Sequence, residues 1–198
     1  MFRSKQRPVV YSQAEHQRLA GAIAAAWDPS RVPLPFVAFV RGVATHDRGY
    51  GAVDEDLIGA IPPERWVEIQ TRGVEPQDDP IVDLVVALHV QRLAEGFTPL
   101  DAHVPERLAA AGVGSDAAAA ADAVTDLCDR LAFSFCFEQA TSGSVGGIAY
   151  AVELDGSATL SPWPLAVPEL REAVVGYEAE GYPERLEPVE RDFVLRPA

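Results

Sequence analysis

Basic residues are scarce in this sequence of 198 residues, and lysine is almost absent. Lys5 is the single lysine, and 16 lysine and arginine residues stand against 30 aspartate and glutamate residues, which gives a formal net charge of −14 at pH 7. A strongly acidic surface repels nucleic-acid backbones and anionic membranes, so we expect neither as a partner. We attribute the preference for arginine, alanine and valine to a GC-rich coding sequence rather than to function.

Cysteine is also rare, and long apolar runs are missing. If one helix carries both Cys128 and Cys136, a rise of about 1.5 Å per residue places them about 12 Å apart, too far for a disulfide. The sequence contains no uninterrupted apolar run long enough for a membrane helix, and residues 1–12 lack the apolar segment of a signal peptide. We therefore expect a cytoplasmic protein with reduced thiols.

The apolar pattern predicts helices in the first two-thirds of the chain and strands after them. Ser12, followed by Glu15 three positions later, is a typical helix start. Helices are expected over residues 13–27, 35–45, 79–95 and 115–138, with a short one from Pro62-Pro63, and a strand is expected over 8–11. Residues 148–154 and 157–160 flank Asp155-Gly156 and predict a hairpin. Residues 169–181 fit a strand or an amphipathic helix, and 193–197 are extended.

These elements predict a mainly α fold with a short β-rich C-terminal region, α+β in class. Hydrophobic residues make up 48% of the chain and charged residues 23%, which is typical of a globular protein. The length suits a single domain with a substantial core. We expect a helical core over residues 1–140 and a β-rich extension over 141–198, packed on that core as one globular unit.

The most informative residues are a set of histidines and aspartates spread over four of the expected helices. His16 lies on the first helix, His46-Asp47 ends the second, His89 falls on the apolar face of the fourth, and Asp129 lies in the fifth. Imidazole nitrogen and carboxylate oxygen are ligands of borderline metals, and helices can direct one or two of them inward. The five residues are therefore our candidate ligands for a divalent metal, which could be Fe, Mn, Zn or Mg.

Each of these residues also has a plain structural interpretation. His46 and Asp47 could simply end a helix, where an imidazole meets the helix dipole. His16 and His89 could be hydrogen-bonded core histidines, and Asp129 could be a solvated helix charge. His103 lies in an expected loop, and we interpret it as a surface residue.

Three residues near the expected metal are candidates for a catalytic role. They are Asp47, His89, which could hold a second metal or face a phosphate, and Arg48, which could neutralise a phosphate or carboxylate group. Arg92 is a second candidate for charge neutralisation, and Tyr50 and Glu138 are candidate acids or bases.

The order His, His-Asp, His, Asp resembles that of the HD superfamily, in which a histidine, a His-Asp pair and a late aspartate hold a metal. A closer resemblance rests on SQAEHQRLAG from Ser12, ATHDRGYG from Ala44, ALHVQRLA from Ala87, CDRLAFSFC from Cys128 and TLSPWPL from Thr159. These segments resemble a bacterial family called domain of unknown function 3891, whose His-Asp-x-Gly-Trp element has Tyr50 in place of tryptophan here. The resemblance implies an HD-like helical bundle, a strand over residues 169–181 and a metal held by His16, His46, Asp47 and Asp129, with His89 as an additional ligand.

Three functions remain open at this point. The first is a metal-dependent hydrolase that acts on a small phosphoester. The second is a di-iron oxygenase of HD-like type with the same ligands. The third is a non-catalytic binding or scaffold protein whose polar cluster stabilises the core. The sequence leaves the substrate and the oligomeric state open.

Overall fold

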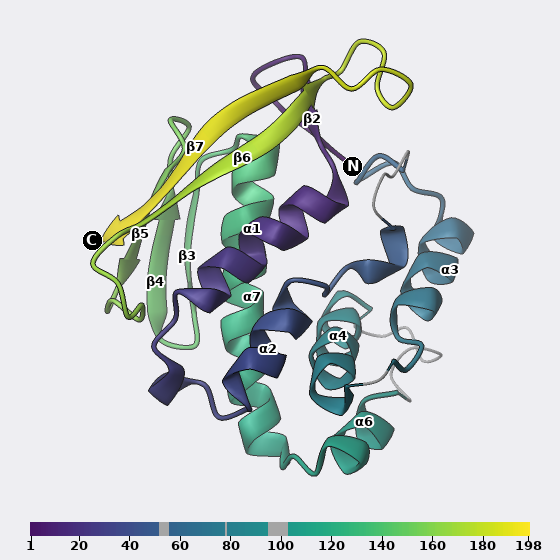
Figure 1. The fold of residues 1–198 in the computed structure, drawn as a ribbon, viewed down its shortest axis with the longest axis vertical. Coiled ribbons are helices and arrows are strands. Elements are labelled where there is room, and N and C mark those ends of the chain that lie inside the picture. The colour runs from purple at the N-terminus through teal and green to yellow at the C-terminus, as the bar shows by residue number, and fades with distance from the viewer. Residues whose placement is uncertain (52–55, 78, 95–102) are drawn as a thin grey trace.

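A computed structural model describes residues 1–51, 56–77, 79–94 and 103–198, which form a curled sheet and a group of helices packed on one of its sides (Figure 1). The helices are α1 (Gln13–Ala25), η1 (Pro29–Arg31), α2 (Phe36–Val43), η2 (Arg48–Tyr50), α3 (Pro63–Gly73), α4 (Pro80–Leu93), α6 (His103–Ala111) and α7 (Ser115–Phe137). The strands are β1 (Phe2–Arg3), β2 (Val9–Tyr11), β3 (Thr141–Val145), β4 (Ile148–Val152), β5 (Ser157–Ser161), β6 (Leu170–Glu178) and β7 (Pro188–Pro197).

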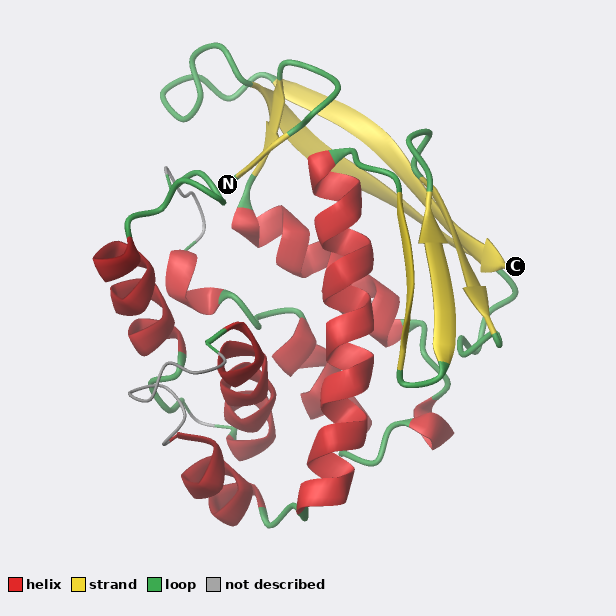
Figure 2. Ribbon diagram, turned by 180° about the vertical axis from the view of Figure 1, so that it is seen from behind, coloured by secondary structure: helices red, strands yellow, loops and turns green. Residues whose placement is uncertain are grey.

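The strands form one mixed sheet in the order β1-β2-β6-β7-β5-β4-β3. Neighbouring strands are antiparallel except for β5 and β7, which are parallel. The two N-terminal strands belong to the same sheet as the C-terminal ones, because β2 pairs with β6 through Val9 and Glu178. The sheet therefore joins both ends of the chain, and Figure 2 shows it curving over the long helix α7.

The expected fold class, a mainly α HD-like bundle with a short β-rich C-terminal region, is wrong. The structure is α+β: in the described part of the chain, a seven-stranded mixed sheet forms one layer and the helices form the other. The error has a physical source. A strand was expected over residues 8–11, where β2 lies, but its partner β6 is far away in sequence, so no local pattern could place it in the C-terminal sheet.

Most individual elements agree with the sequence patterns. The Ser12 side chain accepts a hydrogen bond from the Glu15 amide at 3.1 Å, and the Asp79 side chain caps α4 in the same way. The segment 169–181, which had two interpretations, contains strand β6. Elements that the sequence patterns did not predict include β1, β3, in a glycine- and serine-rich stretch, and α6, which begins at His103 where a loop was expected.

Two glycines allow the helices around the histidines to approach closely. A Cβ atom on Gly21 of α1 would lie 2.5 Å from the Cβ of Ala44, which follows α2. A Cβ atom on Gly42 of α2 would lie 2.7 Å from the Cβ of Val85 on α4. Both separations are below van der Waals contact, so these crossings need glycine. They bring together the three helices that lead to His16, His46 and His89.

One large apolar cluster lies between the helices and the sheet and holds the two layers together. Phe135 of α7 and Phe193 of β7 are fully buried in it, with ring centroids 5.4 Å apart. Cys128 and Cys136 are buried free thiols in the same cluster. None of the helices described here is both long enough and apolar enough to cross a membrane.

Candidate metal centre

Four of the five candidate ligands lie close together between α1, α2 and α7, where the two histidines each approach both carboxylates through Nε2. The Nε2 atom of His16 is 3.1 Å from Oδ1 of Asp129 and 3.1 Å from Nε2 of His46. Oδ2 of Asp47 is 3.8 Å from Nε2 of His16 and 3.5 Å from Nε2 of His46. Nε2 of His46 is 3.6 Å from Oδ1 of Asp129. The structure thus brings together residues that are more than one hundred positions apart in sequence.

The backbone fixes which nitrogen of His46 faces this point. Its Nδ1 atom is 2.6 Å from the carbonyl oxygen of Val43. Because a carbonyl oxygen only accepts hydrogen bonds, Nδ1 carries the hydrogen and Nε2 is left with its lone pair. Metal-binding histidines are typically oriented by such a second hydrogen bond.

The spacing and chemistry of the four atoms fit a divalent cation. Ligand atoms held at about 2.1 Å from a metal lie about 3.0–3.4 Å apart in tetrahedral or octahedral geometry, close to the separations observed. His16, His46 and Asp47 are also buried, with exposed fractions of 0%, 1% and 7%. The lone pair of His46 and the two carboxylate oxygens are hydrogen-bond acceptors, and Nε2 of His16 can supply one hydrogen to them. A bound cation would satisfy the acceptors that remain.

The pKa shifts in the cluster reflect the same crowding of negative charge. Burial lowers the pKa of His46, but the charges of Asp47 and Asp129 outweigh burial and raise it to about 8. Burial raises the pKa of Asp129, but hydrogen bonds from His16 and His46 outweigh this and hold it well below its usual value. Without a cation, the cluster therefore attracts a proton in its place.

His89 lies beside the cluster, but both of its ring nitrogens contact other groups. An Arg92 guanidinium nitrogen donates to Nδ1 of His89 at 2.9 Å. Because arginine only donates, the His89 hydrogen is on Nε2, which donates to Oδ1 of Asp47 at 3.2 Å. Burial, and then the neighbouring His46, lower the pKa of His89 and favour this neutral form. In this arrangement, His89 orients Asp47.

The two candidate arginines have different surroundings. Arg48 turns away from the cluster: it donates to the carbonyl oxygens of Gly73 and Glu75 and pairs with Asp83 at 3.0 Å. Arg92 lies at the edge of the cluster, 3.7 Å from Asp129. Arg92 also pairs with Asp122 and Asp126. Arg48 therefore anchors the His46-Asp47 turn to the segment before α4, and Arg92 holds His89.

The remaining candidates lie outside the cluster. His103 is the half-buried first residue of α6. Glu138 ends α7, where its carboxylate bonds to Arg7 at 2.5 Å and to the Tyr11 hydroxyl at 3.1 Å. Tyr50 lines the cavity above the cluster, but burial raises the pKa of its hydroxyl far above neutrality. This disfavours Tyr50 as a base.

A cavity of about 150 Å³ opens above the cluster, with His16, Asp47, His89 and Asp129 among its lining residues. Its walls were not predicted from the sequence. They consist of six apolar or aromatic side chains from separate segments: Phe2, Tyr50, Ile58, Trp66, Leu93 and Phe133. Two of them carried a signal in the sequence, because Leu93 and Phe133 each come four positions after a candidate ligand on the same helix.

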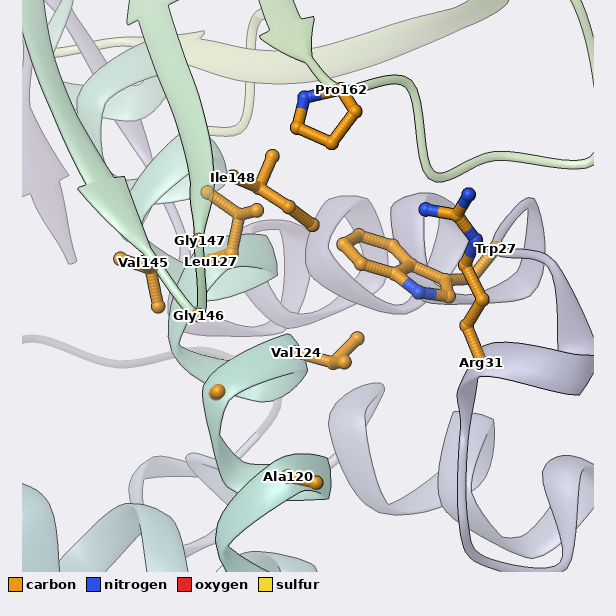
Figure 3. Close-up of a pocket in the computed structure, with 11 residues that line it drawn as sticks. Trp27, Arg31, Ala120, Val124, Leu127, Val145, Gly146, Gly147, Ile148 and Pro162 are labelled. Carbon is orange, nitrogen blue, oxygen red and sulfur yellow. The ribbon is translucent and has the colours of Figure 1, made fainter.

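A larger cavity of about 480 Å³ lies between α7 and the turn joining β3 to β4. Figure 3 shows the Trp27 indole, Val124 and Ile148 facing it, with Arg31 beside the indole. Arg31 is the single ionisable residue among its described lining residues. This cavity therefore lacks the acid, base and metal-ligand groups found above the histidines.

Comparisons with known proteins give no relative. A scan against family models, a search of curated proteins and a search of solved structures each return no match. The function must therefore be argued from the site itself.

Proposed function

We propose that this protein is a metal-dependent hydrolase that acts on a small phosphoester, with one divalent cation held by His16, His46, Asp47 and Asp129. The proposal rests on the close approach of the His16 and His46 imidazoles to each other and to both carboxylates, with His46 oriented by a backbone carbonyl. The order of the ligands along the chain is the second support, because it resembles the order used by the HD superfamily. The buried free thiols Cys128 and Cys136 agree with a cytoplasmic protein.

The residues around the ligands have separable roles in this proposal. A bound divalent cation would lower the pKa of a water molecule and polarise a phosphoryl oxygen. His89 orients the Asp47 carboxylate through Nε2, and Arg92 holds His89 in the required tautomer. Arg92 also contributes positive charge at the side of Asp129, where a phosphoryl group would approach. The apolar walls of the cavity exclude bulk water, which strengthens these interactions.

A second grouping, formed by His46, His89 and Asp129, also has ligand atoms close together and favours the di-iron oxygenase as the second candidate. The geometry supports it less well. Because Nδ1 of His46 donates a hydrogen bond to the Val43 carbonyl oxygen, the imidazole has one free lone pair, on Nε2. It can therefore bind one cation at a time. The ring nitrogens of His89 contact Arg92 and Asp47.

The test is elemental analysis of protein purified without chelators. We expect one divalent metal per chain, and its loss in the double variant His46→Ala, Asp47→Ala. His103→Ala is the matched control, since His103 lies outside the cluster, and should keep the metal. Two irons per chain with visible absorption would favour the oxygenase. No metal, together with a melting temperature that chelators leave unchanged, would favour the binding or scaffold protein.

Activity is tested with a panel of phosphoesters on the metal-loaded protein. We expect hydrolysis that chelation abolishes and that metal restores. The double variant should be inactive while remaining folded by circular dichroism. A stoichiometric metal without hydrolysis of any phosphoester would refute the proposed reaction but keep the metal site.

A further inference from the structure

The cavity above the metal ligands has an unusual chemical character for a phosphoester site. Its described lining residues include no lysine and no arginine. One part of its surface consists of the polar atoms of the candidate ligands and Gln13. The rest is apolar or aromatic and includes Phe2, Tyr50 and Trp66. For a substrate in this cavity, the bound metal would therefore be the main source of positive charge.

The mouth of the cavity is apolar as well. Leu93 and Phe133 are exposed to 47% and 37%, and they stand out because most large apolar side chains of the described chain are buried. The same two residues, with Asp129, line an adjoining recess of about 240 Å³. An exposed pair of apolar side chains at the entrance to a polar site is typical of a binding surface.

The recess contains two arginines, but acidic residues already neutralise them. Arg130 pairs with Asp126 at 2.9 Å, and Arg92 pairs with Asp126 at 3.1 Å. Arg92 also contacts Asp122 and Asp129. With three carboxylates around two guanidinium groups, the recess can accept one phosphoryl group but is poorly suited to a chain of phosphates.

We propose that the substrate of this site is a monophosphate ester of an apolar alcohol, with an aromatic ring as the best fit. This inference rests on the proposed function and names its substrate class. The phosphoryl group lies in the adjoining recess, beside Asp129 and Arg92, and the apolar group lies in the cavity, beside Trp66, Leu93 and Phe133. The cavity has a volume of about 150 Å³, which suffices for one benzene-sized ring, and the recess of about 240 Å³ leaves room for the phosphoryl group.

The experiment is a binding measurement that does not depend on turnover. Isothermal titration calorimetry compares benzylphosphonate with methylphosphonate, which share the phosphonate group and differ in the ring. For the metal-loaded protein, we expect benzylphosphonate to bind at least about tenfold more tightly, since burying the ring adds hydrophobic free energy. Leu93→Ala and Phe133→Ala should reduce this preference to about threefold or less. Leu154→Ala is the matched control, because Leu154 is exposed to 49% and lines neither the cavity nor the recess.

The outcomes separate this inference from the proposed function. Equal affinity for the two phosphonates, no binding of benzylphosphonate, or a preference that survives both substitutions would overturn the inference. A preference that depends on Leu93 and Phe133 supports it. If such a preference is found and no phosphoester is hydrolysed, the ligand class stands and the proposed reaction fails. If hydrolysis is found and diphosphate or triphosphate esters are preferred, the reaction stands and the inference fails.

Discussion

The close crossing of α2 and α4 makes a quantitative prediction for the substitution Gly42→Ala. The added methyl group would lie 2.7 Å from the Val85 Cβ and 3.0 Å from both of its γ-carbons. Ordinary carbon contacts are about 3.5–4.0 Å, so the helices must separate by about 1 Å. Overpacking of this kind costs about 1–3 kcal/mol, and the better helix propensity of alanine offsets about 1 kcal/mol of it. We expect a net loss of about 1 kcal/mol in the free energy of unfolding.

The same displacement should also change the positions of the proposed metal ligands, because α2 leads directly into His46 and Asp47. Ligand distances in metal sites are held to about 0.2 Å, so a shift of about 1 Å should weaken metal affinity by about tenfold or more. Urea denaturation of the metal-free protein measures the first effect, and competition with a chelator measures the second. Gly114→Ala is the control, since a Cβ atom there meets nothing within 4 Å.

A second substitution identifies the cause. Val85→Ala removes the two γ-carbons that the new Cβ would meet at 3.0 Å and keeps the Cβ at 2.7 Å. Because part of the clash is relieved, the double variant Gly42→Ala, Val85→Ala should be more stable than the sum of the single effects implies, by about 1 kcal/mol. A Gly42→Ala protein that is as stable as the parent and binds metal equally well would refute the reasoning. It would show that the helices can separate there without cost and that the crossing does not set the ligand geometry.

Three further predictions concern charged groups. Arg48→Ala should lower the free energy of unfolding by about 3–5 kcal/mol, because the buried Asp83 loses its charged partner and keeps the Gln77 amide alone. Arg41→Ala, at an exposed pair, should cost less than about 1 kcal/mol in the same urea titration. The pKa of Glu138 is below its ordinary value of 4.5, since hydrogen bonds, chiefly from Arg7, outweigh burial. The resulting stability is present above pH 4.5 and is lost as the pH falls through the lowered pKa. Glu138→Gln should therefore be less stable than the parent at pH 7 and nearly equal to it in strong acid. Metal binding must displace the proton that His46 holds up to a pH of about 8, so affinity measured by chelator competition should rise with pH up to that value and level off above it.

Most of the helices, and the histidines and aspartates that the structure brings together, could be picked out because their signals are local. Ser12 caps α1 and Asp79 caps α4 as their residue types indicate, and apolar spacing marks the buried faces. The contact between His89 and Arg92 was also within reach, since residues three positions apart on a helix are neighbours. Local signals thus identified the parts of the site.

What could not be predicted depends on contacts between distant segments. Val9 pairs with Glu178 across nearly the whole chain, so the sheet that joins the two ends has no counterpart in any local pattern. Arg48 was a candidate for neutralising a substrate phosphate or carboxylate, and it is instead 3.0 Å from the buried Asp83 of α4. The aromatic walls come from segments as far apart as Phe2 and Phe133. Charge and apolar character can be read from a sequence, but the partner of a charge cannot.

The structure also bears on whether the metal is needed for folding. In small zinc-binding domains, the metal supplies most of the folding free energy, because there is little core. Here the apolar cluster joins α1 and α7 to the sheet with fully buried side chains such as Leu131 and Phe193, and it is built without the ligands. In the absence of a cation, a proton on His46 can offset part of the charge of Asp47 and Asp129. The metal-free protein should therefore be folded and binding-competent, because the core rather than the cation holds the four ligand atoms in place.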